Sequence, residues 1–205
     1  MKKVILLFGG LLFLPFFIFA QRVELTPFGG YVFASKMYAS NGNVRFLGNA
    51  QYGAILSVAV SRVCDVDLIY NRSDTKAEIN VSDYPYKQVP LSINYMQIGF
   101  TKNFRVHPKV SPFVGFNLGA CLMAPKEDYY DAWFFSMGLN AGAKIYLSNH
   151  FGLRLQAQGL FPVEGSGYSF FVGTGGTGGG VSLYSSMIQF GLTGSLIFRI
   201  GSVSP

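Results

Sequence analysis

The sequence predicts an all-β protein, specifically an eight-stranded antiparallel up-and-down transmembrane β-barrel. Three observations lead to this fold class. Segment after segment alternates between apolar and polar side chains, which is the period of a strand with two different faces. The residues after position 20 contain no apolar run of the ~20 residues that a membrane-spanning helix needs. The links between the alternating segments are short and long in turn, as in membrane barrels.

The first residues, MKKVILLFGGLLFLPFFIFA, predict a cleaved secretory signal peptide over 1–20. A basic start, an apolar stretch and a small residue before the polar Gln21 are its typical parts, and cleavage is expected after Ala20. An uncleaved membrane anchor is the alternative, against which Pro15 and the short apolar stretch argue. We expect residues 21–205 to form a single barrel domain.

The composition excludes several function classes. Loss of Lys2 and Lys3 with the signal peptide lowers the formal net charge from +6 to +4, which is too small an excess to predict nucleic-acid binding. With only two cysteines and two histidines there is no zinc-type spacing. We therefore expect no cofactor and no metal.

The alternation covers eight segments, which in chain order are 23–34, 51–61, 64–71, 93–104, 112–123, 133–147, 151–161 and 187–200. In the first segment Leu25 and Phe33 oppose Glu24, and Pro27 predicts a local break or bulge. In the seventh, FGLRLQAQGLF, the odd positions are mostly apolar and the even positions include one arginine and two glutamines. The other segments repeat this division, with apolar side chains on one parity and small or polar side chains on the other.

The links predict which end of the barrel is which. Short turns are expected around Arg62, at 105–110 and at 148–150, and long loops at 35–50, 72–92, 124–132 and 162–186. Outer-membrane barrels have short periplasmic turns and longer external loops. Both chain ends then fall on the short-turn side.

The polar face is rich in glycine, serine, threonine and amides with isolated charges, whereas the exposed face of a soluble protein would be rich in lysine and acidic residues. We therefore expect the polar face to point inward and the apolar face to contact lipid. An eight-stranded barrel has an interior that side chains fill, and charges inside it must be paired. The predicted polar network of the lumen is Glu24, Asp65, Asp67, Gln97, Asn117, Asn140, Lys144, Arg154, Gln156, Gln158, Gln189 and Arg199. A gated proton or small-ion path through these residues is the alternative.

Aromatic residues lie near both ends of the apolar face, where membrane barrels have interfacial girdles. Those expected near the short turns are Phe104, Phe151 and Phe198, and those expected near the long loops are Phe33, Tyr52, Trp133 and Phe161.

Three stretches, TPFGGYVF, TKNFRVHPKVSPFVGFNLGA and KIYLSNHFGLRLQAQGLFP, carry a resemblance to a known family. With them the chain resembles the small outer-membrane barrels of the OmpX and OmpA transmembrane-domain type. It looks closest to the "outer membrane protein beta-barrel" family of Bacteroidota, which includes PorT-like proteins. The resemblance implies location in the outer membrane of a Gram-negative bacterium. The chain departs from many such barrels by continuing GSVSP after its last strand.

No catalytic pattern is found, so we expect no enzyme. His107 and His150 fall in predicted short turns, and no GxSxG motif occurs. The Gly-rich stretch 170–184 lacks the lysine of a phosphate-binding loop. Its aromatic neighbours Tyr168, Phe170, Phe171 and Tyr184 are either a candidate contact surface or an extension of the hairpin. Cys64 and Cys121 are predicted too far apart for an intramolecular disulfide.

The sequence thus predicts a monomeric integral outer-membrane barrel of structural or interaction type. Its lumen would be plugged by polar side chains, and its long loops would meet an extracellular ligand or an envelope protein. A narrow channel, or an accessory subunit of an envelope transport or secretion complex, is the first alternative. A soluble lipocalin-like binder is the second.

Overall fold

The computed structural model describes residues 22–39, 42–81, 87–104, 106–107, 109–126, 131–163, 168–173, 176–181 and 187–200. The predicted signal peptide lies outside these residues. Within the described part of the chain, no helix has the length and hydropathy that a membrane-spanning helix requires.

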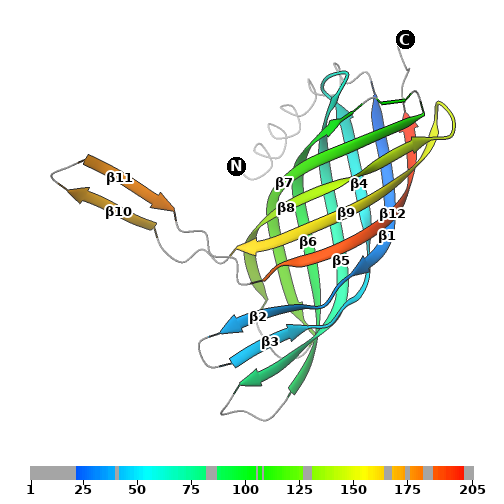
Figure 1. Cartoon of the computed structure of the whole chain (residues 1–205). Coiled ribbons are helices and arrows are strands. Elements are labelled where there is room, and N and C mark those ends of the chain that lie inside the picture. Colours follow the sequence, from blue (N-terminus) through cyan, green and yellow to red (C-terminus); the bar gives the residue numbers. More distant parts are fainter. Residues whose placement is uncertain are drawn as a thin grey trace, which may run out of the picture.

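Eight strands form a closed antiparallel barrel (Figure 1). They are β1 (Val23–Val32), β4 (Asn49–Ala59), β5 (Cys64–Val81), β6 (Lys87–Asn103), β7 (Val110–Pro125), β8 (Ala132–Tyr146), β9 (Phe151–Val163) and β12 (Gln189–Ile200). Each pairs with the next in this order, and β12 pairs with β1 to close the ring. The predicted eight-stranded up-and-down barrel is confirmed.

Short turns join the barrel strands at one end, where β1 also begins and β12 ends (Figure 1). Two of these turns share one design. In the β4–β5 turn the Ser61 hydroxyl accepts the backbone N–H groups of Val63 and Cys64. In the β8–β9 turn the Ser148 hydroxyl accepts those of His150 and Phe151. Serine therefore satisfies turn backbone groups that the ladders leave unpaired.

The opposite end differs from the sequence prediction. Most of the expected loop 72–92 is a continuation of β5 and β6, and the expected loop 35–50 contains the hairpin of β2 (Ser35–Ala39) and β3 (Gly42–Phe46). Because β3 pairs with the outer part of β5, a sheet of β2, β3, β5 and β6 extends beyond the barrel. We call it the external sheet.

The extension was missed because its outward face is charged. Along β5, Ser73 and Thr75 are buried while Asp74 and Lys76 point the other way, so the strand period persists beyond Tyr70. A prediction that depends on apolar residues of one parity ends the strand where those residues end.

A second difference lies in the expected loop 162–186. It contains β10 (Tyr168–Gly173) and β11 (Gly176–Val181), which form a separate two-stranded sheet. The candidate contact residues Tyr168, Phe170 and Phe171 belong to β10, for which the structure describes the strand but not the side chains. Tyr184 lies outside the described residues.

The outer wall of the barrel is apolar and exposed. Leu155 is 58% exposed and Leu192 is 54% exposed, whereas Arg154 and Lys144 are 0% exposed. A soluble lipocalin-like barrel would bury its large aliphatic side chains, so this distribution argues against that alternative.

The predicted girdle residues lie on this outer wall. Phe33, Tyr52, Phe104, Trp133, Phe151 and Phe198 are exposed. Phe151 and Phe198 pack edge to face at the short-turn end, with their ring centroids 5.6 Å apart. Phe161 is only half-buried rather than fully exposed. Its ring lies close to the backbone of Gly159, where the missing side chain leaves space for it.

Substitution of neighbouring residues in β9 tests which side faces lipid. Leu155→Glu places a carboxylate on the lipid-facing wall, at a cost on the order of 2 kcal/mol near mid-membrane. Gln156→Glu places the same charge next to the Arg154 guanidinium inside the barrel. In heat-modifiability gels of refolded protein, we expect Leu155→Glu to lose most of the folded band and Gln156→Glu to keep it. Equal losses would contradict the assigned faces.

Candidate functional site

The polar interior is the part of the described structure that gathers most of the predicted site residues. Every predicted lumen residue points inward, although they come from different strands. Those with less than a tenth of their surface exposed are Glu24, Asp65, Asp67, Gln97, Asn117, Asn140, Lys144, Arg154, Gln156, Gln158 and Gln189. Arg199 as a whole residue is only half-buried, although its side chain is 9% exposed.

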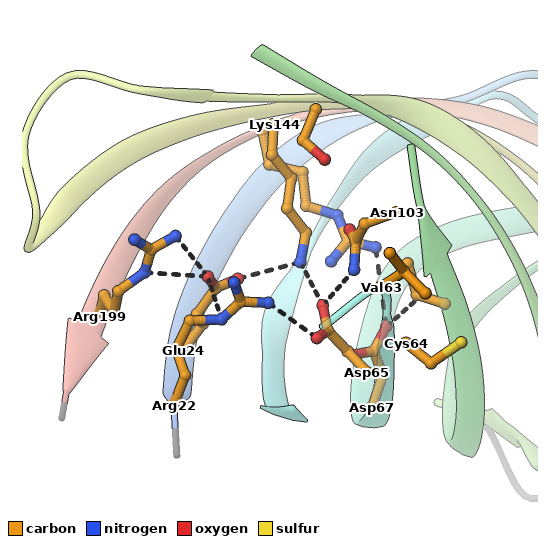
Figure 2. Close-up of polar contacts among 12 residues, drawn as sticks. Arg22, Glu24, Val63, Cys64, Asp65, Asp67, Asn103, Lys144 and Arg199 are labelled. Atoms are coloured by element: carbon orange, nitrogen blue, oxygen red, sulfur yellow. Dashed lines mark hydrogen bonds and ion pairs between the residues drawn. The ribbon is translucent and has the colours of Figure 1, made fainter. Parts of the chain in front are cut away.

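A charge cluster of Arg22, Glu24, Asp65, Lys144 and Arg199 occupies the short-turn end (Figure 2). Lys144 on β8 lies at its centre. Its Nζ donates to Glu24 Oε2 at 3.0 Å and to Asp65 Oδ2 at 2.8 Å. A lysine on β8 thereby joins carboxylates from β1 and β5 across the lumen.

Two arginines flank the central lysine. Arg22 lies 2.9 Å from Asp65 Oδ1 and 3.3 Å from Glu24 Oε1. Arg199 on β12 lies 3.1 Å from the same Glu24 oxygen and stacks on the Tyr146 ring at 4.0 Å. The Tyr146 hydroxyl also donates to Glu24 Oε1, at 3.1 Å. Each carboxylate therefore has several donors, which a buried ion pair needs to offset its desolvation.

Arg154 and Asp67 form the next layer of the interior. The Arg154 guanidinium donates to Gln156 Oε1 at 2.6 and 2.9 Å and lies 4.3 Å from the centre of the Phe113 ring. Its distance to Asp67 Oδ2 is 3.9 Å. The Thr101 hydroxyl donates to the same Asp67 oxygen at 2.6 Å. Arg154 is therefore held by an amide, a ring face and a longer ion pair.

Amide side chains continue the network toward the long-loop end. Gln156 donates to Gln158 at 3.0 Å, and Gln158 donates to Gln51 at 2.9 Å. In a parallel set of contacts, Asn140 donates to Asn117 at 3.1 Å and Gln97 donates to Ser136 at 3.0 Å. Two of these bonds link strands that do not pair with each other: Gln158 to Gln51 joins β9 and β4, and Gln97 to Ser136 joins β6 and β8.

Glycines make room for these amides. A Cβ atom added at Gly99 would collide with the Asn117 side-chain oxygen. One added at Gly115 would meet the Asn140 oxygen at 2.5 Å. Both glycines point into the lumen, and their missing side chains leave space in which the amides of neighbouring strands pack.

At the long-loop end the interior becomes apolar. We call the buried residues there the internal apolar cluster, which consists of Phe46, Ala77, Leu91, Ile93, Tyr95, Cys121, Leu160 and Met187. The Tyr95 hydroxyl connects it to the polar part by donating to Gln189 Oε1 at 2.6 Å. The lumen thus changes from charged to amide to apolar along its length.

Sequence reasoning missed this cluster because residues 91–96, LSINYM, contain apolar side chains on both parities. It also missed Arg22 and Tyr146. Arg22 shares the parity of Glu24 and lies one residue before the predicted segment 23–34, and Tyr146 shares that of Lys144 within the segment 133–147, so parity would have identified both.

The described residues contain no group of three or more metal-ligating side chains. His107 and His150 are exposed in turns, and His107 Nδ1 accepts the backbone N–H of Lys109. Cys64 and Cys121 are free thiols. The chemistry that the interior supports is the mutual pairing of buried charges and amides.

Removal of the central lysine tests the charge cluster. Lys144→Met leaves Glu24 and Asp65 with fewer donors, and breaking a buried ion pair on one side costs about 3–5 kcal/mol. We expect urea unfolding of the protein in detergent micelles to show a loss of this size. Lys109→Met removes an exposed turn lysine and is the control, for which we expect a change within about 0.5 kcal/mol. If the unfolding free energy of Lys144→Met fell by no more than that of Lys109→Met, the charge cluster would contribute little to stability.

Comparisons with known proteins bear on the fold. No protein-family model matches the chain, and no curated protein matches its sequence. Among solved structures, Neisserial surface protein A aligns with a TM-score of 0.58 and 9% identity, over 88% of this chain and 97% of that one. OprG from Pseudomonas aeruginosa gives a TM-score of 0.55 and 9% identity, over 87% and 96%. The N-terminal β-barrel domain of P. aeruginosa OprF gives 0.53 and 15%, over 88% and 98%. The chain therefore has the eight-stranded barrel fold of small outer-membrane proteins.

Proposed function

We propose that the protein is an integral outer-membrane barrel of structural or interaction type. In this proposal its lumen is plugged, and its external sheet and loops meet an extracellular ligand or an envelope protein. The observation that carries the proposal is the combination of an apolar exposed wall with an interior crossed by bonded polar side chains. Such a molecule is stable in lipid and offers no wide passage.

The plug is supported from both ends of the lumen. At the short-turn end, Lys144 and its two carboxylates are at most 2% exposed. At the long-loop end, Ile93 and Cys121 of the internal apolar cluster are both 0% exposed. An ion that crossed the barrel would have to disrupt a buried ion-pair network and then enter an apolar region, and each step carries a large desolvation cost.

The external sheet supports the interaction role. β5 and β6 continue well past the level of Tyr52 and Tyr70, where the outer wall changes from apolar to charged. The added strands β2 and β3 widen this sheet to four strands. A sheet that rises above the membrane gives a partner a firmer surface than unstructured loops do.

Cysteine labelling tests the orientation and location together. We expect Arg45→Cys in the external sheet to react with a membrane-impermeant maleimide on intact cells of a Gram-negative host. Ser148→Cys in a short turn should react only after the outer membrane is opened. Both are placed in a Cys64→Ser background, because Cys64 is partly exposed. The reverse labelling pattern would invert the orientation, and labelling of neither in membrane fractions would count against outer-membrane insertion.

Conductance tests the plug. Purified, folded protein in planar bilayers should show no reproducible openings above the bare-membrane baseline, while a general porin under the same conditions opens. Discrete openings that scale with the amount of inserted protein would remove the plugged-barrel proposal.

A narrow channel is the second candidate. It would act either alone or as an accessory subunit of an envelope transport or secretion complex. It is favoured by buried polar atoms without a partner in the described interior, among them Asp67 Oδ1, Gln97 Oε1 and Arg154 Nη1. Water molecules would satisfy such atoms, and a chain of waters would provide a path. The same bilayer recording separates this candidate from the first.

A further inference from the structure

A groove lined by described residues runs along the outer wall of the barrel. It has a volume of about 560 Å³ and crosses β7, β8, β9 and β12 up to the end of β1. Ala141 and Ala157, which pair directly across β8 and β9, form its floor. Larger side chains, including Leu139, Leu192 and Phe190, form its walls. Small residues between large ones form a groove of a shape that suits a flexible hydrocarbon chain.

The groove ends at Phe33, close to the start of the external sheet. Lys36 follows three residues later, and a chain of three residues spans at most about 11 Å. The end of the groove on the long-loop side is therefore near the first basic residue of β2.

Three basic residues adjoin each other on the outward face of the external sheet, and we call them the basic triad. Lys36 pairs directly with Arg45 across β2 and β3. In the β3–β5 ladder Arg45 lies opposite Glu78. Lys76 is therefore the diagonal neighbour of Arg45 on the same face, about 7–8 Å away. The triad with Glu78 carries a formal charge of +2.

The triad differs from the other basic residues of this face. Arg72 and Lys126 both pair with Asp74, at 3.1 Å each, and the hydrogen bond from Arg72 holds the pKa of Asp74 below its usual range. Within the described residues, no side-chain hydrogen bond or ion pair joins Lys36, Arg45 or Lys76 to another group. All three side chains are exposed.

We propose that the groove and the basic triad together bind one phosphorylated lipid of the external leaflet. An acyl chain lies in the groove over Ala141 and Ala157, and the head-group phosphate meets the triad. The proposal rests on the membrane orientation proposed above. Two features support a lipid rather than a soluble anion: the groove is apolar and faces the bilayer, and the basic charges begin where that apolar wall ends.

The test uses two lipids that differ only in the phosphate. Purified full-length protein in detergent micelles is titrated with phosphatidic acid or diacylglycerol, and bound lipid is counted by native mass spectrometry. We expect one saturable phosphatidic acid per chain and at least about tenfold weaker binding of diacylglycerol, since several basic groups contribute at an anionic head group. Inorganic phosphate at the lipid concentration should not displace the lipid.

Variants separate the two halves of the site. Lys36→Gln/Arg45→Gln/Lys76→Gln should weaken phosphatidic acid about tenfold or more and remove most of its salt dependence. Ala157→Phe fills the groove and should weaken both lipids while the salt dependence remains. The matched controls are Arg62→Gln/Lys102→Gln/Lys109→Gln at the short-turn end and Ala54→Phe on the opposite part of the wall, for which less than a twofold change is expected.

Three results would overturn the proposal: equal binding of the two lipids, displacement by inorganic phosphate alone, or equal effects of the site and control variants. The maleimide labelling pattern of the same variants is measured in parallel, with Asp131→Cys as the cysteine at the long-loop end, because position 45 is already changed in the triad variant. If it is unchanged, loss of lipid binding is a failure of this site, whereas a changed pattern points to the orientation.

Discussion

The structure depends on one constraint, which is that polar side chains from all eight strands must satisfy each other inside a narrow barrel. The outer wall is apolar, so these groups cannot turn outward without exposing charge to that side. At the short-turn end, Lys144 meets this requirement by donating hydrogen bonds to Glu24 and Asp65. Because each partner stands on a different strand, the network fixes the relative positions of strands that share no backbone ladder. Buried polar groups of this kind specify one arrangement when they are fully bonded.

The two ends of the interior are filled by different kinds of side chain. The short-turn end concentrates charge, and Arg22, Lys144 and Arg199 together exceed the two carboxylates by one positive charge. The long-loop end has apolar side chains instead, with Tyr95 at the boundary. An apolar interior suits the end where β5 and β6 continue upward, since Phe46 of β3 and Ala77 of β5 join the same cluster. The external sheet is therefore packed onto the lumen and is not a loose appendage of it.

The sequence allowed the barrel, its strand number and the inward parity to be predicted, because alternation is local and a one-residue shift exchanges the two faces. Gln97, Asn117 and Arg154 all follow from parity alone. Which inward residues touch could not be predicted. Lys144 and Glu24 are 120 positions apart, and their contact depends on how strands tilt and stagger around the ring. The external sheet was not predicted for a different reason. When both faces of a strand are polar, the alternation of side chains produces no contrast in hydropathy.

That loss of contrast has a physical meaning. Beyond Tyr70 the inward residues of β5 stay buried and uncharged (Asn71, Ser73, Thr75 and Ala77), while the outward ones change at Tyr70 from Leu68 to Arg72. The strand itself does not change, so the change must reflect the surroundings of its outer face. An apolar medium ends there and a polar one begins, and tyrosine stands at the border, as its ring and hydroxyl suit both. In the proposed orientation, charges just beyond such a border lie at the depth of lipid head groups, where the exposed Lys36, Arg45 and Lys76 would be within reach of a phosphate.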